Sequence, residues 1–436
     1  MKVLYLLESV FKFLGYLLKL IFHNNKNTAR IQFKRLKRLI QYSWDNIPAY
    51  RKLWEEHGFT PSMFKSIEDL KLLPVIDKNF VRENSRSMCS VSYNPDKLTT
   101  VTTGGTTGMP MRFLIDNYNA RAKELAYQIW GNWHYFGHIQ GVDRVVTLRG
   151  YRVNNQLIDQ HIFWEQNNRE NGIYMSSFHI LEENYEIYLS KLRNYKPKYI
   201  KAYPSSIVAL CSLMRNHGDK GIPCLKGVIC SSENVYDWQR VLIRDVLGVE
   251  IYSFYGHSEK SVCAFQTHQF TYEFPPLYGF VEFLDSGFNS VKESEVGRVV
   301  VTSFDNHYFP FIRYNTDDYV QVGECTSGNK CALKIIGREQ EFVFDEYGNK
   351  VIFTCSDEPL WGIDGILAYQ YVQNVPGVLN LNLMVSEYFN YTSIQQILEK
   401  AKIIFVNFRV EVNIVDDISR TNSGKFRYLV QNINYA

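Results

Sequence analysis

The stretch Thr102–Pro110, TTGGTTGMP, places three glycines and four threonines within nine residues. Such a flexible turn can bring backbone N–H groups and threonine hydroxyls around an oxyanion, for example a triphosphate. It is not a Walker A loop, because Met109, Pro110 and Met111 stand where a lysine and a hydroxyl would be needed. The stretch therefore predicts a phosphate-binding loop, and the alternative is a Gly/Thr-rich surface turn between strands.

Strand-like and helix-like segments alternate after this loop. Residues 111–116 alternate as a strand does, and residues 119–133 have helical spacing. Later strands are predicted at 143–150 and 197–205, and later helices at 185–195 and 206–216. This order predicts an α/β fold with substantially parallel pairing, in a chain of 436 residues that is long enough for two or three domains.

Two apolar strands of this series end in polar residues. They are LKGVICSSENV at 225–235 and VEIYSFYGHSE at 249–259. Ligands in open α/β sheets gather beyond the carboxyl ends of strands, where Glu233 and Glu259 are expected. A carboxylate near polyphosphate is repelled unless a divalent cation lies between them, so Glu259 is a candidate Mg²⁺ ligand. The alternative for Glu259 is a carboxylate that begins a helix.

Three later segments carry further candidates. In FPFIRYNTDDYV, Asp318 is able to accept hydrogen bonds from ribose hydroxyls, and in LKIIGREQEFVF, Arg338 is able to reach ribose or phosphate. In SRTNSGKFRYLV, Lys425 lies on a Ser-Gly turn between two arginines, which suits neutralising a phosphoryl or acyl oxygen. The alternative for Asp318 and for Arg338, each taken alone, is a surface ion pair, and the alternative for Lys425 is a basic tail.

Taken in order, six motifs resemble the signature series of the adenylate-forming superfamily, which includes acyl-CoA synthetases, peptide-synthetase adenylation domains and luciferases. The motifs are TTGGTTGMP, SSEN, YGHSE, RYNTDD, IGREQ and RTNSGKFR. Residues 47–80 and AYPSS at 202–206 also resemble the phenylacetate–CoA ligase branch, including the CapK-like proteins associated with capsular polysaccharide synthesis. The resemblance covers roughly Asn46 to the end of the chain.

The resemblance implies an architecture and a reaction. It implies a large α/β domain of several subdomains at 26–337, which binds ATP and the acyl group, and a small mobile α+β domain at 338–436 that carries Lys425. A hinge is expected near Arg338–Glu341. ATP, with Mg²⁺, would activate a carboxylic acid as an acyl-adenylate. The acyl group would then pass to an acceptor, usually the thiol of CoA or of a carrier-protein pantetheine.

The resemblance also gives roles to single residues. Tyr255 would lie against adenine, Asp318 would hold the ribose with help from Arg338, and Glu233 would border the nucleotide. The residues expected to catalyse are Lys425, Thr107 and Glu259, with Glu259 as the metal ligand. The residues expected to bind the nucleotide are Thr103, Gly105, Thr106, Thr107, Gly108, Glu233, Tyr255, Gly256, Asp318 and Arg338.

The chain departs from the family pattern at three motif positions. Asp317 stands where glycine is usual, which leaves the local turn uncertain. Gln340 occupies a hinge position that is often aspartate, and Gly104 replaces a serine of many members. Residues that line the acyl pocket are proposed by position alone, and the alternative is that the aromatic ones belong to the core. Candidates by position are Trp133, His134, Tyr135, Phe136, Tyr203 and Ser205.

The eight cysteines are scattered, without tight Cys-x-x-Cys pairs and without a secretory signal. This pattern predicts mostly buried, reduced cysteines in a cytosolic protein. Cys263 with His268 resembles half of the zinc site found in some relatives. Cys325 and Cys331 either complete that site or flank a hairpin loop.

The first 25 residues are expected to form an amphipathic helix outside the family resemblance. Glu8, Lys12 and Lys19 are the only charges in residues 3–22, and a helix would place them on one stripe of an otherwise apolar surface. A run of six basic residues follows at 26–38. This combination predicts contact with an anionic inner membrane face. The alternative is a helix packed on the protein's own core or on a homodimer partner.

The leading interpretation is an AMP-forming ligase acting near the inner face of the membrane in surface-polysaccharide modification. One rival joins the acyl group to a sugar amine or hydroxyl of a glycan precursor, and another is a non-catalytic nucleotide-binding scaffold. Nucleic acid is not an expected partner, because the net charge is only +3.

Overall fold

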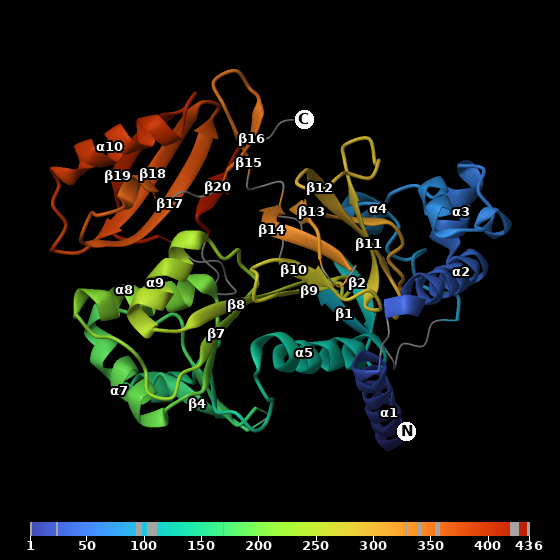
Figure 1. The fold of residues 1–436 in the computed structure, drawn as a ribbon, viewed down its shortest axis with the longest axis horizontal. Helices are drawn as coiled ribbons and strands as arrows, with labels where there is room; N and C mark the ends of the chain where they lie inside the picture. Colours follow the sequence, from blue (N-terminus) through green and yellow to red (C-terminus); the bar gives the residue numbers. More distant parts are fainter. Residues whose placement is uncertain are drawn as a thin grey trace. The chain divides into compact units, whose positions relative to one another are not determined.

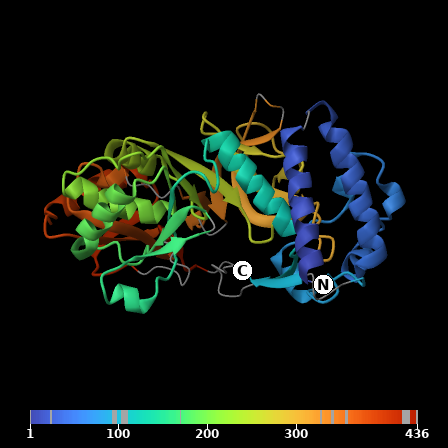
Figure 2. The ribbon, with the colours of Figure 1, turned by 90° about the horizontal axis from the view of Figure 1, so that it is seen from below.

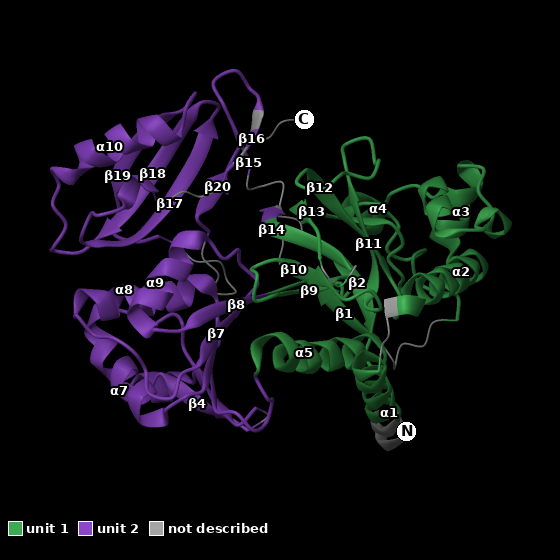
Figure 3. Cartoon of the chain, viewed as in Figure 1, with its two compact units in different colours: residues 1–137, 254–335 green, residues 138–253, 336–436 purple. Residues whose placement is uncertain are grey.

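The structure is a computed structural model (Figure 1). It describes residues 2–22, 25–92, 98–102, 111–168, 170–325, 327, 329–338, 342–353, 358–418 and 427–433. The chain divides into two compact units (Figure 3). Unit 1 holds residues 1–137 and 254–335, and unit 2 holds residues 138–253 and 336–436. The domain boundaries expected after residues 25 and 337 stay predictions.

Unit 1 is an antiparallel sheet with helices and a separate hairpin. Its helices are α1 (Lys2–Ile21), α2 (Thr28–Asn46), α3 (Pro48–Glu56), α4 (Lys78–Glu83) and α5 (Ala120–Phe136). Its sheet has the order β11-β12-β13-β14-β10-β9-β8. The strands are β8 (Glu250–Gly256), β9 (Cys263–Gln266), β10 (Tyr272–Phe274), β11 (Gly279–Leu284), β12 (Val296–Ser303), β13 (Tyr314–Gly323) and β14 (Lys330–Arg338). Strands β8 and β14 each continue across the division between the units.

The hairpin joins β1 (Leu98–Thr102) to β2 (Arg112–Asp116), the strand predicted at 111–116. The two strands are antiparallel, with Thr102 opposite Arg112. A parallel pair would need a crossover of about a dozen residues or more, and the connection here is shorter. Two neighbouring antiparallel strands therefore flank the Gly/Thr stretch, whose residues 103–110 lie outside the described part of the chain.

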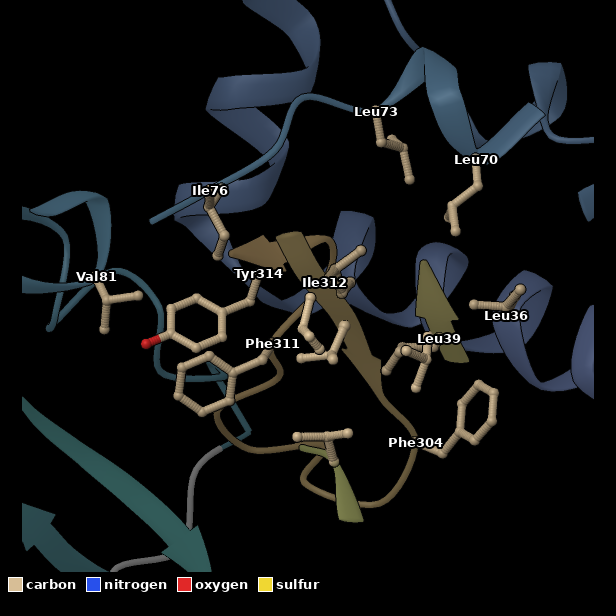
Figure 4. Packing of buried hydrophobic residues seen from close by; sticks show 14 of the residues in the cluster. Leu36, Leu39, Leu70, Leu73, Ile76, Val81, Phe304, Phe311, Ile312 and Tyr314 are labelled. Atoms are coloured by element: carbon tan, nitrogen blue, oxygen red, sulfur yellow. The ribbon is translucent and has the colours of Figure 1, made fainter. Parts of the chain in front are cut away.

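The core of unit 1 forms where the first helices cover its sheet. Leu36 and Leu39, three residues apart on α2, point toward the sheet together with Leu70 and Leu73 (Figure 4). They meet Ile312, which precedes β13. Burying one such side chain contributes about 1.5–3 kcal/mol. This packing fixes the start of β13, the strand that carries Asp318.

A buried charge cluster fastens α1 and α2 to the rest of unit 1. Helix α1 lies alongside α5 (Figure 2). The hydroxyl of Tyr16 on α1 lies 2.8 Å from Asn119 Oδ1 and 2.9 Å from Asp305 Oδ1, so these two acceptors share its one proton. Arg35 on α2 donates to the same Asp305 oxygen at 2.7 Å, and Lys123 Nζ on α5, fully buried, lies 3.6 Å from Asp305 Oδ2. One carboxylate therefore joins three helices.

Unit 2 contains the parallel sheet that the alternation predicted. Its order is β7-β6-β3-β5-β4, parallel except for the edge pair β4/β5. The strands are β3 (Val145–Leu148), β4 (Trp164–Asn167), β5 (Gly172–Met175), β6 (Tyr199–Ala202) and β7 (Gly227–Ser231). The helices are α6 (Asn155–Ile158), α7 (Tyr185–Tyr195), α8 (Pro204–Asn216) and α9 (Asp237–Leu247).

The remainder of unit 2 is a small α+β part. A second sheet has the order β19-β18-β17-β20. Its elements are β17 (Ile366–Val375), β18 (Val378–Val385), β19 (Arg409–Ile414), β20 (Leu429–Gln431) and helix α10 (Ser393–Ile404). A hairpin of β15 (Phe342–Phe344) and β16 (Lys350–Ile352) precedes them. The predicted α/β fold class, with a small α+β part at the C-terminal end, is confirmed.

The cysteine prediction is wrong for one pair. Cys325 and Cys331 form a disulfide across the loop between β13 and β14. The two residues flank a hairpin loop, as one of the two alternatives proposed. Because both thiols are used in the bond, they cannot complete a zinc site with Cys263 and His268. Within the described ranges, no group of three or more His, Cys, Asp or Glu side chains is placed to hold a metal ion.

Candidate nucleotide site

Three predicted site residues lie where β8 ends in unit 1. Tyr255 and Gly256 are the last residues of β8, and Glu259 follows three positions later in a turn. His257 lies in the same turn, and its carbonyl accepts a hydrogen bond from the Lys260 N–H at 3.2 Å. The turn therefore places an aromatic ring, an imidazole and a carboxylate close together along the chain.

A bulge in β13 presents Asp318 opposite this turn. Arg298 of β12 pairs with Tyr319, but Val300, two residues on, pairs with Asn315, four residues back along β13. The extra residues on β13 bend the strand locally. The hydroxyl of Thr316 donates to Val299 O at 2.8 Å and accepts the Asp318 N–H at 3.2 Å. The bulge is thus anchored on β12.

Asp317, the departure from the family pattern, occupies a left-handed backbone position with φ of 63°. Glycine adopts this region without a Cβ penalty, and aspartate is among the few other residues that tolerate it. The N–H of Asp317 donates to Asn315 Oδ1 at 3.1 Å, and its carboxylate pairs with Lys78 Nζ at 2.6 Å. The turn that was uncertain from sequence is therefore formed with aspartate in the place of glycine.

Asp318 is held by two donors from the end of β8. Tyr255 Oη donates to Asp318 Oδ2 at 2.8 Å, and His257 Nε2 lies 2.5 Å from the same oxygen. Asp318 is only 5% exposed. The structure therefore brings Tyr255 and Asp318 together, as two residues of one nucleotide site should be. Sequence reasoning did not select His257, although it stands inside the motif YGHSE.

Glu259 is also buried, with 5% of its surface exposed. Its Oε1 accepts the hydroxyl of Tyr314 at 3.1 Å, and Tyr314 is the first residue of β13. In the part of the chain that the structure describes, no Lys, Arg or His lies within ion-pair distance of Glu259. A buried carboxylate without a positive partner is costly, so a bound cation would stabilise it. Mg²⁺ is commonly held by one or two carboxylates together with substrate phosphates, and Glu259 fits that pattern.

Glu233 lies in unit 2, two residues beyond the end of β7. Its Oε2 accepts the backbone N–H of Ser205 at 2.9 Å, and the Ser205 hydroxyl donates to its Oε1 at 3.0 Å. Ser205 is in the first turn of α8, so Glu233 stabilises a helix N-terminus. Glu233 therefore lies beyond the end of a strand, as predicted. Its role beside the nucleotide stays a prediction.

The acyl-pocket candidates divide between the units. Trp133 on α5 is 53% exposed, whereas Tyr135 and Phe136 are buried against Phe265 in the core of unit 1. Tyr203 and Ser205 belong to unit 2. Core packing therefore explains why Tyr135 and Phe136 are aromatic, without a role in an acyl pocket.

Several predicted residues lie outside the part of the chain that the structure describes. They are Thr103, Gly105, Thr106, Thr107, Gly108 and Lys425. Arg338 is the last residue of β14, and its side chain is not described. Tyr314 was missed by sequence reasoning, although the motif RYNTDD contains it. Tyr314 could have been selected because it lies four residues before Asp318, on the strand that carries this predicted site residue.

The chain is similar to known proteins in sequence and in structure. A family model, the CapK C-terminal domain, matches residues 343–432. Protein CapK of Staphylococcus aureus is 22% identical over 415 residues, which cover 92% of this chain and 89% of that protein. A phenylacetate–coenzyme A ligase of Thermus thermophilus is 24% identical over 383 residues, with 82% of each chain covered. A solved structure of 2-hydroxyisobutyryl-CoA ligase, in the postadenylation state in complex with R3-HIB-AMP, matches with a TM-score of 0.70. It is 19% identical and covers 93% of this chain and 89% of its own.

The fold is that of the adenylate-forming superfamily, and the structural neighbours are acyl-CoA ligases of that superfamily. Within it, the homologues of this chain are CapK and phenylacetate–CoA ligases, and the chain carries the CapK C-terminal domain. The predicted resemblance to this superfamily and to its CapK and phenylacetate–CoA ligase branch is confirmed. The same relatives support an AMP-forming ligase, the predicted class of enzyme.

Proposed function

We propose that this protein uses ATP and Mg²⁺ to convert a carboxylic acid into an acyl-adenylate, and then transfers the acyl group to an acceptor. The observation that supports it most is the pair of buried carboxylates in unit 1. Asp318 is fixed by Tyr255 and His257, and Glu259 is fixed by Tyr314 without a positive partner among the described residues. The motif resemblance assigns Asp318 to the ribose and Glu259 to the metal.

The proposed roles follow the chemistry of each group. Asp318 accepts the ribose hydroxyls, and the Tyr255 ring lies against adenine. Glu259 holds Mg²⁺, which when bound neutralises charge on the phosphates. The Gly/Thr loop, through Thr106 and Thr107, cradles the phosphates. Adenylation needs alignment and neutralised charge more than covalent help.

Lys425 completes the proposed charge neutralisation from the C-terminal part of unit 2. Its ammonium would stabilise the oxygen that develops charge as the acid attacks the α-phosphate. Arg338, at the end of β14, is proposed to help hold the ribose from the expected hinge.

The acceptor is proposed to be the thiol of CoA or of a carrier-protein pantetheine. The supporting observation is that the matching 2-hydroxyisobutyryl-CoA ligase was also solved in the thioesterification state with 2-HIB-AMP and CoA. It matches with a TM-score of 0.57 at 20% identity. An amine or hydroxyl of a glycan precursor is the second candidate acceptor, and the likeness to protein CapK favours a place in capsule or surface-polysaccharide synthesis.

Acid-dependent pyrophosphate exchange tests the first half-reaction. With a panel of aryl, aliphatic and amino acids, at least one acid should stimulate exchange in the presence of ATP and Mg²⁺. Changing Lys425 to alanine should lower that exchange tenfold or more, because one charge on the developing oxyanion is lost. ATP binding without any acyl-adenylate would instead support a nucleotide-binding scaffold. Product mass with CoA, holo-carrier protein or an aminosugar identifies the acceptor.

A membrane surface is proposed as a further partner, through α1. No helix among the described residues is long and apolar enough to cross a membrane. However, α1 keeps an exposed apolar face while Tyr16 anchors its other side. The face consists of Val10, Phe11, Leu14, Leu18, Ile21 and Phe22. At about 100° per residue these positions fall on one side of the helix.

Exposed basic residues follow this apolar face in the sequence, before and on α2. They are Lys26, Arg30, Lys34, Lys37 and Arg38. Arg35 of the same run differs, because it turns inward to Asp305. An apolar helix face followed by cations suits an anionic membrane surface, to which each cation adds about 1 kcal/mol. The proposed location is therefore the cytoplasmic face of the membrane.

Changing Phe11 and Phe22 together to serine should lower pelleting with phosphatidylglycerol-containing liposomes at least tenfold, since the two rings are 72% and 77% exposed on the apolar face. Burial of each ring in lipid is worth about 1.5–3 kcal/mol. The matched control is Phe288 to serine, an exposed phenylalanine elsewhere in unit 1. Equal pelleting of both variants, or pelleting that does not depend on phosphatidylglycerol, would contradict the proposal.

A further inference from the structure

His257 is a buried imidazole with one hydrogen-bond partner. Its Nε2 lies 2.5 Å from Asp318 Oδ2, and both side chains are 7% exposed. Its Nδ1 is buried and has no hydrogen-bond partner among the residues that the structure describes. The ring of Tyr255 packs edge-on against the imidazole, with 5.0 Å between the ring centres. The imidazole of His257 therefore makes its polar contact with the carboxylate of Asp318.

The contact has a defined donor and acceptor. Ionised Asp318 can only accept hydrogen bonds, so His257 must carry a proton on Nε2. The Tyr255 hydroxyl donates to the same oxygen. Two donors that converge on one oxygen restrict rotation of the carboxylate about its Cβ–Cγ bond more than either donor alone does. Because a ribose is recognised by the direction in which a carboxylate accepts, this restriction bears on nucleotide binding.

The backbone of Asp318 alone does not fix this direction. The bulge at Asp317 and the Thr316 hydroxyl position the Asp318 backbone. The direction of the side-chain oxygens depends on the groups that bind them. Tyr255, near the end of β8, and His257, directly after β8, both donate to Asp318 Oδ2.

We propose that His257 is a positioning residue that orients the Asp318 carboxylate toward the ribose hydroxyls of the bound nucleotide. This inference rests on the proposed function, which places the nucleotide beside Asp318. It assigns a role to a residue that lies between the predicted adenine contact and the predicted metal ligand. His257 acts through Asp318 and takes no part in the bonds that form or break.

Ribose-modified nucleotides test this role directly. Binding of ATP, 2′-deoxyATP and 3′-deoxyATP is measured by titration calorimetry with the wild type, with His257→Leu and with His257→Gln. In the wild type, at least one missing hydroxyl should weaken binding about tenfold, because the buried carboxylate then lacks a donor. In His257→Leu, ATP should bind about tenfold more weakly while that deoxynucleotide is little changed, so the preference for the hydroxyl is lost. In His257→Gln, whose side-chain amide is able to donate from nearly the same place, the preference should return.

Kinetics supply a second readout. In pyrophosphate exchange, His257→Leu should raise the KM for ATP about tenfold and change kcat and the KM for the acid less than threefold. The matched control is His57→Leu, an exposed histidine directly after α3 in the same unit, which should behave as the wild type. Thermal unfolding of every variant shows whether it is folded at the assay temperature.

The outcomes separate two failures. If the wild type binds none of the three nucleotides, the proposed function fails and this inference fails with it. If the wild type binds ATP and discriminates against the deoxynucleotide, but His257→Leu keeps that discrimination, the function stands and the positioning role is overturned. Equal weakening of all three nucleotides in His257→Leu, without recovery in His257→Gln, likewise assigns His257 to the stability of the turn alone.

Discussion

Changing Glu259 to glutamine should lower acyl-adenylate formation by about a hundredfold to a thousandfold. Glutamine keeps the size of the side chain and an oxygen for the Tyr314 hydroxyl, which lies 3.1 Å from Glu259 Oε1. It removes the negative charge that we propose to hold Mg²⁺. Losing one electrostatic contact to the developing charge of a transition state typically costs that much in rate. The measurement is acid-dependent pyrophosphate exchange with the acid that the panel identifies.

The metal dependence of this variant makes the prediction specific. If Glu259 is a metal ligand, Glu259→Gln should need a higher Mg²⁺ concentration for half-maximal exchange than the wild type. Its thermal stability should be equal or higher, because a buried charge without a positive partner among the described residues is removed. The matched control is Glu293→Gln, an exposed glutamate of unit 1, which should leave both quantities unchanged. An unchanged exchange rate in Glu259→Gln would remove this residue from the proposed site.

Local sequence patterns could predict the helices and the order of the motifs, because these depend on neighbouring residues. Helix α7 begins and ends where the apolar spacing indicated. The alternation at 111–116 predicted a strand, yet it could not say that β2 pairs with β1 in a hairpin apart from the main sheets. Pairing depends on the length of the connection and on tertiary contacts as well as on alternation.

The candidate site could be predicted as a set of motifs, whereas its contacts could not. His257 and Asp318 are 61 positions apart in the sequence. They meet because β8 and β13 belong to one sheet with a bulge at Asp317, and the bulge depends on a left-handed residue that the motif alone left uncertain. The disulfide between Cys325 and Cys331 was missed for a similar reason, since cysteine spacing does not show which strands flank a loop.

Changing Asp305 to alanine should lower the free energy of unfolding by about 3–5 kcal/mol, the cost of breaking a buried ion pair by removing one partner. Lys123 is fully buried, and Arg35 and Tyr16 converge on the same carboxylate. Without Asp305 these groups keep their desolvation cost and lose their shared acceptor. Urea unfolding followed by circular dichroism measures the loss. The matched variant is Asp305→Ala with Lys123→Met, which removes both buried charges and should recover part of the stability.

The contribution of Asp305 to the free energy of unfolding should depend on pH. Burial raises the pKa of Asp305, but the charges of Lys123 and Arg35 and the hydroxyl of Tyr16 lower the pKa more, so that it lies below the ordinary value. A carboxyl whose folded-state pKa is depressed contributes stability above its unfolded-state pKa, about 3.9 for aspartate. That stability is lost as the pH falls through the folded-state pKa. The difference in unfolding free energy between wild type and Asp305→Ala should therefore be constant near neutral pH and shrink below about pH 4. A difference that stays constant down to pH 2, or one under about 1 kcal/mol at pH 7, would show that Asp305 does not join α1, α2 and α5 through its charge.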